Sequence, residues 1–250
     1  MMGNRTSGSN TIAKCSEDLW PYVWAIRDPE CLDWKRGLTD EEIEVLSLRQ
    51  SEMPVEITET LFLSTQRHVE DVNHLNTLGI THVLNVAGKG ARGPVDLYKA
   101  QGITYKEIDA HDEPGYDMIG GHLKECQAFI EVAKAAGGKC VVHCHAGINR
   151  SGVIVAAVHL LQGSEANRTN TNVLDTVAHC RHQRSNCFLW NHCFQLQLVC
   201  LAKENNLLGP MPGSTGCIAL DQAPPYTTYL AEFANEGSES GKKGSIKDLF

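Results

Sequence analysis

The segment His143–Ser151, with the sequence HCHAGINRS, has the residue types needed to bind an anion and to attack it. It follows an apolar run of strand length at 139–143 and precedes an apolar stretch at 151–162 that is expected to be a helix. A tight loop between a strand and a helix directs successive backbone N–H groups at an anion, and the helix dipole adds positive potential there. Gly147 lets the backbone turn closely, because it has no side chain. The segment therefore predicts a phosphate-binding loop.

Two side chains of this loop are suited to displacement at phosphorus. Cys144 is expected to be a thiolate near neutral pH, because the loop amides and the Arg150 guanidinium stabilise its negative charge. Arg150 can hold two phosphoryl oxygens in a bidentate fork, which lysine cannot do. Ser151 can donate a hydrogen bond to the sulfur and make it a better leaving group, and His143 is expected to orient the loop and help keep Cys144 ionised. This chemistry requires no metal and no other cofactor.

The leaving oxygen of a phosphomonoester needs a proton, which a carboxylic acid from another loop can supply. Asp112 is the best candidate, because it lies just past the expected strand at 103–108, in the turn-rich segment DAHDEPG. The same group could then act as a base toward the attacking water. Asp109, Glu113 and Asp117 compete with it for this role.

The elements that must position these loops alternate along the chain. Short apolar runs predict strands, the first of them a strand pair, at 56–63, 82–86, 103–108 and 139–143. Apolar residues at helical spacing predict helices at 70–78, 119–136, 151–162, 172–182 and 191–205. This alternation is typical of an α/β domain.

The pattern His-Cys-x-x-Gly-x-x-Arg-Ser, about thirty residues after an Ala-x-Asp turn, resembles the cysteine-dependent dual-specificity protein phosphatases of the protein tyrosine phosphatase superfamily. The resemblance covers roughly residues 54–205 and includes a closing-helix pattern that begins at Asn191. In that family the cysteine is the nucleophile, the arginine binds phosphate and the aspartate is the general acid. These roles map onto Cys144, Arg150 and Asp112.

The resemblance also implies a fold and a substrate class. The expected fold is a central mixed, mostly parallel sheet flanked by helices, and the expected substrate is a phosphoprotein carrying phosphotyrosine and phosphoserine or phosphothreonine. Substrate contacts are expected from the loop residues His145, Ala146, Gly147, Ile148, Asn149 and Arg150. Related lipid phosphatases have lysines in this loop, so their absence here disfavours a phosphoinositide. His145 fits a substrate contact and a solvent-facing side chain equally well.

The chain departs from the family pattern at several positions. Ser64 stands where glycine is usual, Trp190 stands where proline is usual, and the interval from Arg184 to Asn191 is about two residues longer than usual. Asn149, where serine is common, is shared with RNA 5′-triphosphatases of the same superfamily. Two alternatives therefore stay open: an RNA 5′-triphosphatase, and a module that binds phosphoproteins without turning them over.

The composition of the chain argues against some classes of binding partner and some cellular locations. The formal charge of −8 argues against a nucleic-acid partner that binds through a broad basic face. No apolar run of membrane-spanning length and no secretory signal is present, which favours a cytoplasmic protein.

The ten cysteines are interpreted as mostly reduced thiols. A zinc site is disfavoured by the spacing of Cys180, His182, Cys187, His192 and Cys193.

The chain divides into four regions. We expect a disordered N-terminus at 1–18, an extension packed on the domain at 19–50, a catalytic domain at 51–208 and a mostly disordered tail at 209–250. Thr39 and Glu42 form a capping-box pattern that predicts a helix through Leu48. Gly3 fits an N-myristoylation motif if Met2 is the initiator or Met1 is lost, and a second signal would then be needed for peripheral membrane association. No motif indicates an oligomeric state.

Overall fold

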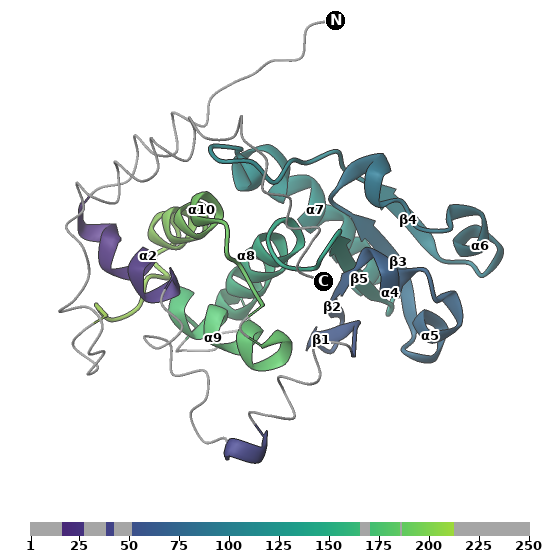
Figure 1. The fold of residues 1–250 in the computed structure, drawn as a ribbon, viewed down its shortest axis with the longest axis horizontal. Helices are drawn as coiled ribbons and strands as arrows, with labels where there is room; N and C mark the ends of the chain where they lie inside the picture. Colours follow the sequence, from purple (N-terminus) through teal and green to yellow (C-terminus); the bar gives the residue numbers. More distant parts are fainter. Residues whose placement is uncertain (1–16, 28–38, 43–51, 166–170, 186, 213–250) are drawn as a thin grey trace, which may run out of the picture.

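The computed structural model describes residues 17–27, 39–42, 52–165, 171–185 and 187–212, and within them a five-stranded sheet lies between two groups of helices (Figure 1). The sheet order is β1-β2-β5-β3-β4. The strands are β1 (Val55–Thr58), β2 (Leu61–Thr65), β3 (Ile80–Asn85), β4 (Thr104–Glu107) and β5 (Lys139–Cys144). In the described sheet β1 and β2 pair antiparallel, and the other neighbours pair parallel. The expected mixed, mostly parallel sheet is thus confirmed.

Helices cover both faces of this sheet. One face packs against α7 (Met118–Ala135), α8 (Arg150–Glu165) and α9 (Val173–Arg184), and α10 (His192–Glu204) packs on these helices. The other face is covered by α4 (Gln66–Val69), α5 (Val72–Thr77) and α6 (Val95–Ala100). Strand β5 serves both layers, because Cys140 and Val142 belong to the larger core cluster and Val141 to the smaller one. The sequence predicted every described strand and α5, α7, α8, α9 and α10, but neither α6 nor the four-residue α4, which is too short to show a helical period.

The parallel register brings the ends of three strands together. Cys144 is paired with Thr65 of β2, and His143 is paired with Asn85 of β3. The loops that follow β2, β3 and β5 therefore meet at one edge of the sheet. Helix α8 begins at this edge and runs through the core, and its residues 153–158 are fully buried because helices and sheet surround it.

A segment before the sheet packs on α9 and α10. The 3-10 helix η1 (Glu17–Leu19) and helix α2 (Trp20–Arg27) contribute Leu19, Val23 and Ile26 to the larger core cluster. Arg181 of α9 donates a hydrogen bond to the Ile26 carbonyl oxygen at 2.6 Å. The helix α2 and the last two helices therefore share one core.

These contacts move the expected region boundaries. Asp18 was assigned to the disordered N-terminus, but it lies in η1 and forms an ion pair with Lys203 at 2.9 Å. Gly209 was assigned to the tail, but its carbonyl oxygen accepts a hydrogen bond from the Tyr22 hydroxyl at 3.0 Å. In both cases the core of the domain reaches further along the chain than composition alone indicates. Residues 1–16 and 213–250 lie outside the described residues.

The capping box predicted near residue 40 is present. The Glu42 carboxylate accepts hydrogen bonds from the backbone N–H of Thr39 at 2.7 Å and from its hydroxyl at 3.0 Å. The Glu42 N–H donates in return to the Thr39 hydroxyl at 3.2 Å. The predicted continuation to Leu48 lies outside the described residues.

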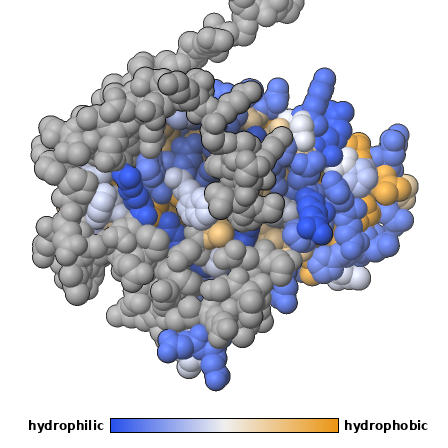
Figure 2. Space-filling model, in the orientation of Figure 1, coloured by the Kyte–Doolittle hydropathy of each residue, from blue (hydrophilic) through white to orange (hydrophobic). Residues whose placement is uncertain are grey.

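On the face shown in Figure 2 the coloured residues are mostly hydrophilic, with apolar patches at the end of the molecule formed by α6. Leu97 of α6 is 56% exposed there. Within the described ranges no helix has both the length and the apolar character needed to cross a membrane.

Candidate active site

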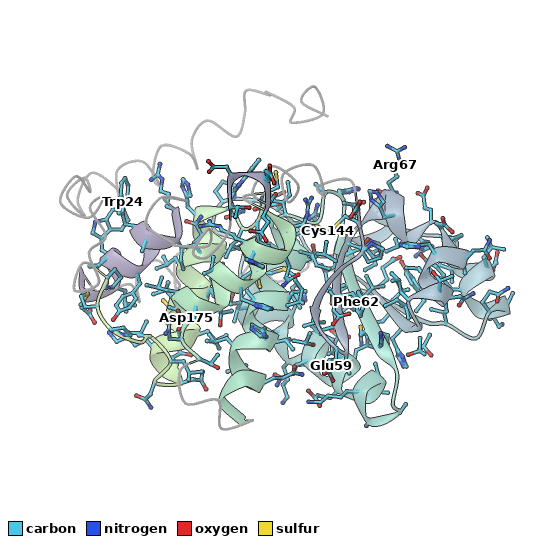
Figure 3. The ribbon with its side chains drawn as sticks, turned by 90° about the horizontal axis from the view of Figure 1, so that it is seen from below. Trp24, Glu59, Phe62, Arg67, Cys144 and Asp175 are labelled. Carbon is cyan, nitrogen blue, oxygen red and sulfur yellow. The ribbon has the colours of Figure 1, made fainter. Side chains whose placement is uncertain are left out.

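Cys144 is the last residue of β5, at the point where the strand passes into the loop before α8. Its side chain is nearly buried, and the Ser151 hydroxyl, fully buried in the first turn of α8, donates a hydrogen bond to its sulfur at 3.2 Å. Figure 3 shows Cys144 and Glu59 at opposite ends of the sheet. The sulfur therefore lies at the edge where the parallel strands end, in contact with the donor that the sequence predicted.

Gly147 occupies the point where the loop turns back on the sheet. Its φ of +65° lies in the left-handed region, which disfavours side chains. A Cβ atom there would lie 2.7 Å from the Ser64 carbonyl oxygen and 3.0 Å from the Met53 Cε. This is the close backbone turn expected from the sequence, and a side chain at this position would force the loop or the neighbouring strand to move.

The carbonyl groups of the loop are bonded outward, to the scaffold. The oxygen of His145 accepts from the Gln66 N–H at 3.0 Å, and that of Ala146 accepts from the Arg184 Nη2 at 3.4 Å. The oxygen of Ile148 accepts from a backbone N–H of the segment before α10 at 3.0 Å. Within the described part of the chain, the N–H groups of residues 146–149 donate to no protein acceptor. They are therefore available to an anion above the Cys144 sulfur.

Arg150 begins α8 beside this loop. Its Nη1 donates a hydrogen bond to the Ala110 carbonyl oxygen at 3.2 Å, and its Nε lies 3.9 Å from the Asp112 Oδ2. The Nε is buried and has no hydrogen-bond partner among the described residues. A buried donor without an acceptor costs free energy, so this N–H is suited to an incoming phosphoryl oxygen.

Asp112 lies over the loop, where two amides hold its carboxylate. The Asn149 Nδ2 donates to one oxygen at 3.2 Å, and the Asn191 Nδ2 donates to the other at 2.9 Å. The side chain is still 29% exposed, so substrate and water can reach it. The carboxylate is thus fixed in position without being sealed off.

Two of the three competing carboxylates, Asp117 and Glu113, are engaged elsewhere or directed to solvent. Asp117 caps α7 by accepting a hydrogen bond from the Gly120 N–H at 2.8 Å. Glu113 is 72% exposed and faces His111 at 4.0 Å. Both have surface or capping contacts, whereas Asp112 is the carboxylate near Arg150. This difference favours Asp112 as the acid.

Asn149 joins three parts of the site. Besides its bond to Asp112, its Oδ1 accepts from the backbone N–H groups of Trp190 at 2.8 Å and of Asn191 at 2.9 Å. Its amide therefore bonds to protein on both sides, and the backbone N–H of Asn149 is the group left for a substrate contact. The asparagine that is shared with RNA 5′-triphosphatases has a structural explanation here.

Ile148 resembles Asn149 in this respect. Its side chain is 6% exposed and packs inside the protein, so only its backbone N–H remains for substrate. His145, in contrast, is exposed, and its Nδ1 lies 2.9 Å from the Gln66 Oε1. Of the side chains between Cys144 and Arg150, His145 therefore extends furthest toward solvent.

His143 is buried, with its Nδ1 donating to the Cys144 carbonyl oxygen at 3.2 Å. Burial lowers the pKa of this histidine to about 4, so the ring is neutral near pH 7. The expectation that it helps keep Cys144 ionised is therefore wrong as far as charge is concerned. What remains is the orienting role, through the ring N–H.

Sequence reasoning assigned no role to two buried side chains that support the site. Arg184 holds the Ala146 carbonyl, and burial lowers its pKa while the nearby Cys187 and Cys144 raise it. Gln197 accepts from the N–H groups of Met118 and the next residue at 2.8 and 3.0 Å, and so fixes the start of α7 after the Asp112 loop. Gln197 belongs to the closing-helix pattern that begins at Asn191, but the pattern alone does not indicate which residues the Gln197 amide contacts.

Comparison with known proteins defines the class. The family described as dual specificity phosphatase, catalytic domain, matches residues 61–204, which is more than half of the chain. The chain therefore belongs to the dual specificity phosphatase family.

Among curated relatives, dual specificity protein phosphatase 26 of Rattus norvegicus is 38% identical over 107 residues, covering 42% of this chain and 50% of that protein. Dual specificity protein phosphatase 1 of Homo sapiens is 33% identical over 181 residues, covering 71% of this chain and 45% of that protein. The chain spans about half the length of the curated relatives it matches.

Solved structures share the fold. Human DUSP28 is 24% identical with a TM-score of 0.51, over 61% of this chain and 94% of that one. The human tyrosine phosphatase-like serine/threonine/tyrosine-interacting protein is 25% identical with a TM-score of 0.50, again over 61% of this chain and 94% of that one. The α/β fold of the phosphatase superfamily is therefore shown for this part of the chain.

Proposed function

We propose that this protein hydrolyses phosphoproteins at phosphotyrosine and at phosphoserine or phosphothreonine, through a phosphocysteine on Cys144. The observation that carries the proposal is the sulfur at 3.2 Å from the Ser151 hydroxyl, below a loop whose carbonyls bond outward. Membership of the dual specificity phosphatase family supports the same reaction.

In the first step the Cys144 sulfur attacks phosphorus. The S–P bond forms as the P–O bond to the leaving group breaks. The free N–H groups of residues 146–149 and the Arg150 guanidinium hold the equatorial oxygens, where negative charge is concentrated. Asp112, in its acid form, gives its proton to the leaving oxygen, which departs as a neutral alcohol or phenol.

In the second step water hydrolyses the phosphocysteine. The Asp112 carboxylate takes a proton from the water, whose oxygen attacks phosphorus as the P–S bond breaks. The sulfur leaves as a thiolate that the Ser151 hydroxyl stabilises by its hydrogen bond. Inorganic phosphate departs, and Asp112 is again protonated for the next cycle.

The test is hydrolysis of phosphotyrosine and phosphothreonine peptides by the full chain in EDTA. Arg150→Lys should lower kcat/KM by roughly 10²- to 10⁴-fold, because two charge-assisted hydrogen bonds of the guanidinium fork are lost. Arg92→Lys is the matched control, since Arg92 makes a similar two-bond contact to Glu107 on the surface, at 2.7 Å for each bond. Its activity should stay within about twofold of the wild type, because surface pairs contribute little.

Three outcomes would contradict the proposal. Equal rates for Arg150→Lys and the wild type would remove the phosphate clamp. Faster turnover of triphosphate-ended RNA than of phosphopeptide would favour the RNA 5′-triphosphatase. Phosphopeptide binding without turnover would favour the binding module.

The proposal also includes the location of the protein in the cell. We propose a cytoplasmic protein that associates peripherally with membranes if Gly3 is acylated, and Gly3 lies outside the described residues. Mass spectrometry of the N-terminal peptide from cells tests the acylation. Membrane fractions of Gly3→Ala and the wild type that contain equal amounts of protein would contradict a role for it.

A further inference from the structure

The segment between α9 and α10 is held directly against the catalytic loop. Leu189 is fully buried, its N–H donates to the Ile148 carbonyl oxygen at 3.0 Å, and its own carbonyl oxygen accepts from the Gln195 Nε2 at 2.8 Å. Its φ of +57° is strained for a leucine, and such strain persists only where the surroundings enforce it. Phe188 is also fully buried. The segment is therefore firmly anchored to the loop.

The next residue, Trp190, is 48% exposed although its two predecessors are fully buried. Its N–H donates to the Asn149 Oδ1 at 2.8 Å, and the same asparagine donates to the Asp112 Oδ2 at 3.2 Å. One side chain thus separates the Trp190 backbone from the proposed acid. Because that acid must face the leaving oxygen, Trp190 is anchored on the leaving-group side of the site.

His145, in the first half of the loop, has a planar side chain, as Trp190 does. His145 is exposed and is linked through its ring to Gln66 of α4, whereas Trp190 is linked to the end of the loop. Cys144 directly precedes the first of these attachment points, His145, and Arg150 directly follows the second, Asn149. A planar group bound at this loop would therefore have flat side chains attached at both ends of the loop.

We propose that Trp190 contacts the organic part of the substrate and favours aryl phosphates, that is phosphotyrosine, over the alkyl phosphates of phosphoserine and phosphothreonine. A phenol ring offers a flat face that packs against an indole, whereas a serine or threonine side chain is too short to do so. The inference rests on the proposed function and adds a specificity residue to it. It also gives a role to the tryptophan that replaces the family's usual proline.

The kinetic test compares Trp190→Ala and Trp190→Phe on matched phosphotyrosine and phosphothreonine peptides. We expect Trp190→Ala to lower kcat/KM for phosphotyrosine by about 3- to 10-fold, chiefly through KM, from the loss of an aromatic pair. The phosphothreonine peptide should change by less than about twofold, and Trp190→Phe should restore most of the loss. Leu97→Ala is the control, because Leu97 is similarly exposed on α6.

Two kinetic results would overturn the proposal. Equal losses on both peptides would show that Trp190 acts through Asn149 and the loop, and not by contact with the substrate. No loss on phosphotyrosine would show that the indole does not touch it.

A binding arm separates this inference from the proposed function. Calorimetry with Cys144→Ser and with Cys144→Ser/Trp190→Ala measures affinity for the same peptides without any turnover. The double variant should lose affinity for the phosphotyrosine peptide by the same factor and keep its affinity for the phosphothreonine peptide. If the wild type proves inactive, the proposed hydrolysis fails, and this difference in affinity still decides the role of Trp190.

Discussion

Two cysteines of strand β5 show how position on a strand sets the chemistry of a side chain. Cys140 and Cys144 are four residues apart, belong to the same core cluster and are 0% and 2% exposed. Burial raises the pKa of the Cys140 thiol. The Cys144 sulfur, in contrast, accepts a hydrogen bond from Ser151 and borders the loop with free N–H groups. The two cysteines are therefore almost equally buried, yet Cys140 is an inert thiol and Cys144 is the proposed nucleophile.

The difference extends to the two ends of the sheet. Polar side chains are buried at the edge near Cys144; the Asn85 amide, for example, donates to the Gly88 carbonyl oxygen and accepts from the Ala87 N–H, both at 2.8 Å. Around Cys140 the neighbours in the core cluster are apolar. The parallel strands thus keep an apolar interior and gather their polar groups where they end. The predictions below test this contrast by changing one member of a pair at a time.

The largest effect should come from the two cysteines themselves. Cys144→Ser should lower kcat on the order of 10⁵- to 10⁶-fold, as expected when a nucleophile is removed. Cys140→Ser should lower the free energy of unfolding by about 1–3 kcal/mol, because a hydroxyl is buried among apolar groups, with kcat of the folded protein within about twofold. Phosphopeptide kinetics and urea unfolding measure both quantities. Activity retained by Cys144→Ser would refute the contrast.

The next largest effect should distinguish two carboxylates of one loop. Asp112→Ala should lower kcat by roughly 10²- to 10⁴-fold, because the leaving oxygen loses its proton donor. Glu113→Ala, one residue further and 72% exposed, should change kcat by less than about twofold. Steady-state kinetics on a phosphothreonine peptide, whose leaving group needs the proton most, provides the measurement. Equal losses in both variants would transfer the acid role away from Asp112.

Two glycines form the third pair. Gly147→Ala should lower kcat/KM by about 10²-fold, because a Cβ atom 2.7 Å from the Ser64 carbonyl oxygen displaces the loop. Gly121→Ala, in α7 with open space around the new Cβ, should instead raise the free energy of unfolding by about 0.5–1 kcal/mol. Kinetics and thermal unfolding of both variants check this. A fully active Gly147→Ala protein would mean that the loop tolerates displacement.

The smallest effect concerns His143 and pH. Its pKa of about 4 in the folded protein lies below the ordinary 6.5, so the unfolded chain binds more protons between these values. The corresponding stability is fully present above pH 6.5 and is lost as pH falls toward 4. Between about pH 7.5 and pH 5 the wild type should lose about 2 kcal/mol more than His143→Gln in urea unfolding.

The exposed His74 supplies the control for this pH dependence. His74→Gln should follow the wild-type pH dependence, because it leaves the buried ring in place. If His143→Gln also lost stability as the wild type does, the buried ring would not be the group that titrates.

Local patterns predicted much of this molecule. Apolar runs of strand length predicted all five described strands, and apolar residues at helical spacing predicted five of the described helices. The spacing of Cys144, Gly147 and Arg150 predicted the loop. These patterns involve residues that are close together in the sequence, so they can be recognised in a single amino-acid sequence. They also predicted the Ser151 contact to the sulfur, because both residues lie within one loop and its helix.

What could not be predicted depends on groups far apart in sequence. The bonds from Asn149 and Asn191 to Asp112 join residues 37 and 79 positions apart, and they exist only once the helices are packed. The charge state of the His143 ring could not be predicted for the same reason, since its pKa follows from burial by tertiary structure. Helix α2 was missed as an element, although its tryptophans indicated a packed segment.

The bond from Arg181 to the Ile26 carbonyl has a practical consequence for anyone who trims this protein. A protein cut at the start of the family match, residue 61, would lack that acceptor and would uncover the apolar surfaces of α9 and α10 that α2 covers. One turn further along α9, Arg184 holds the catalytic loop through Ala146. Rate constants measured on such a shortened protein would therefore describe a loop with altered support, and kinetic measurements should use a protein that retains α2.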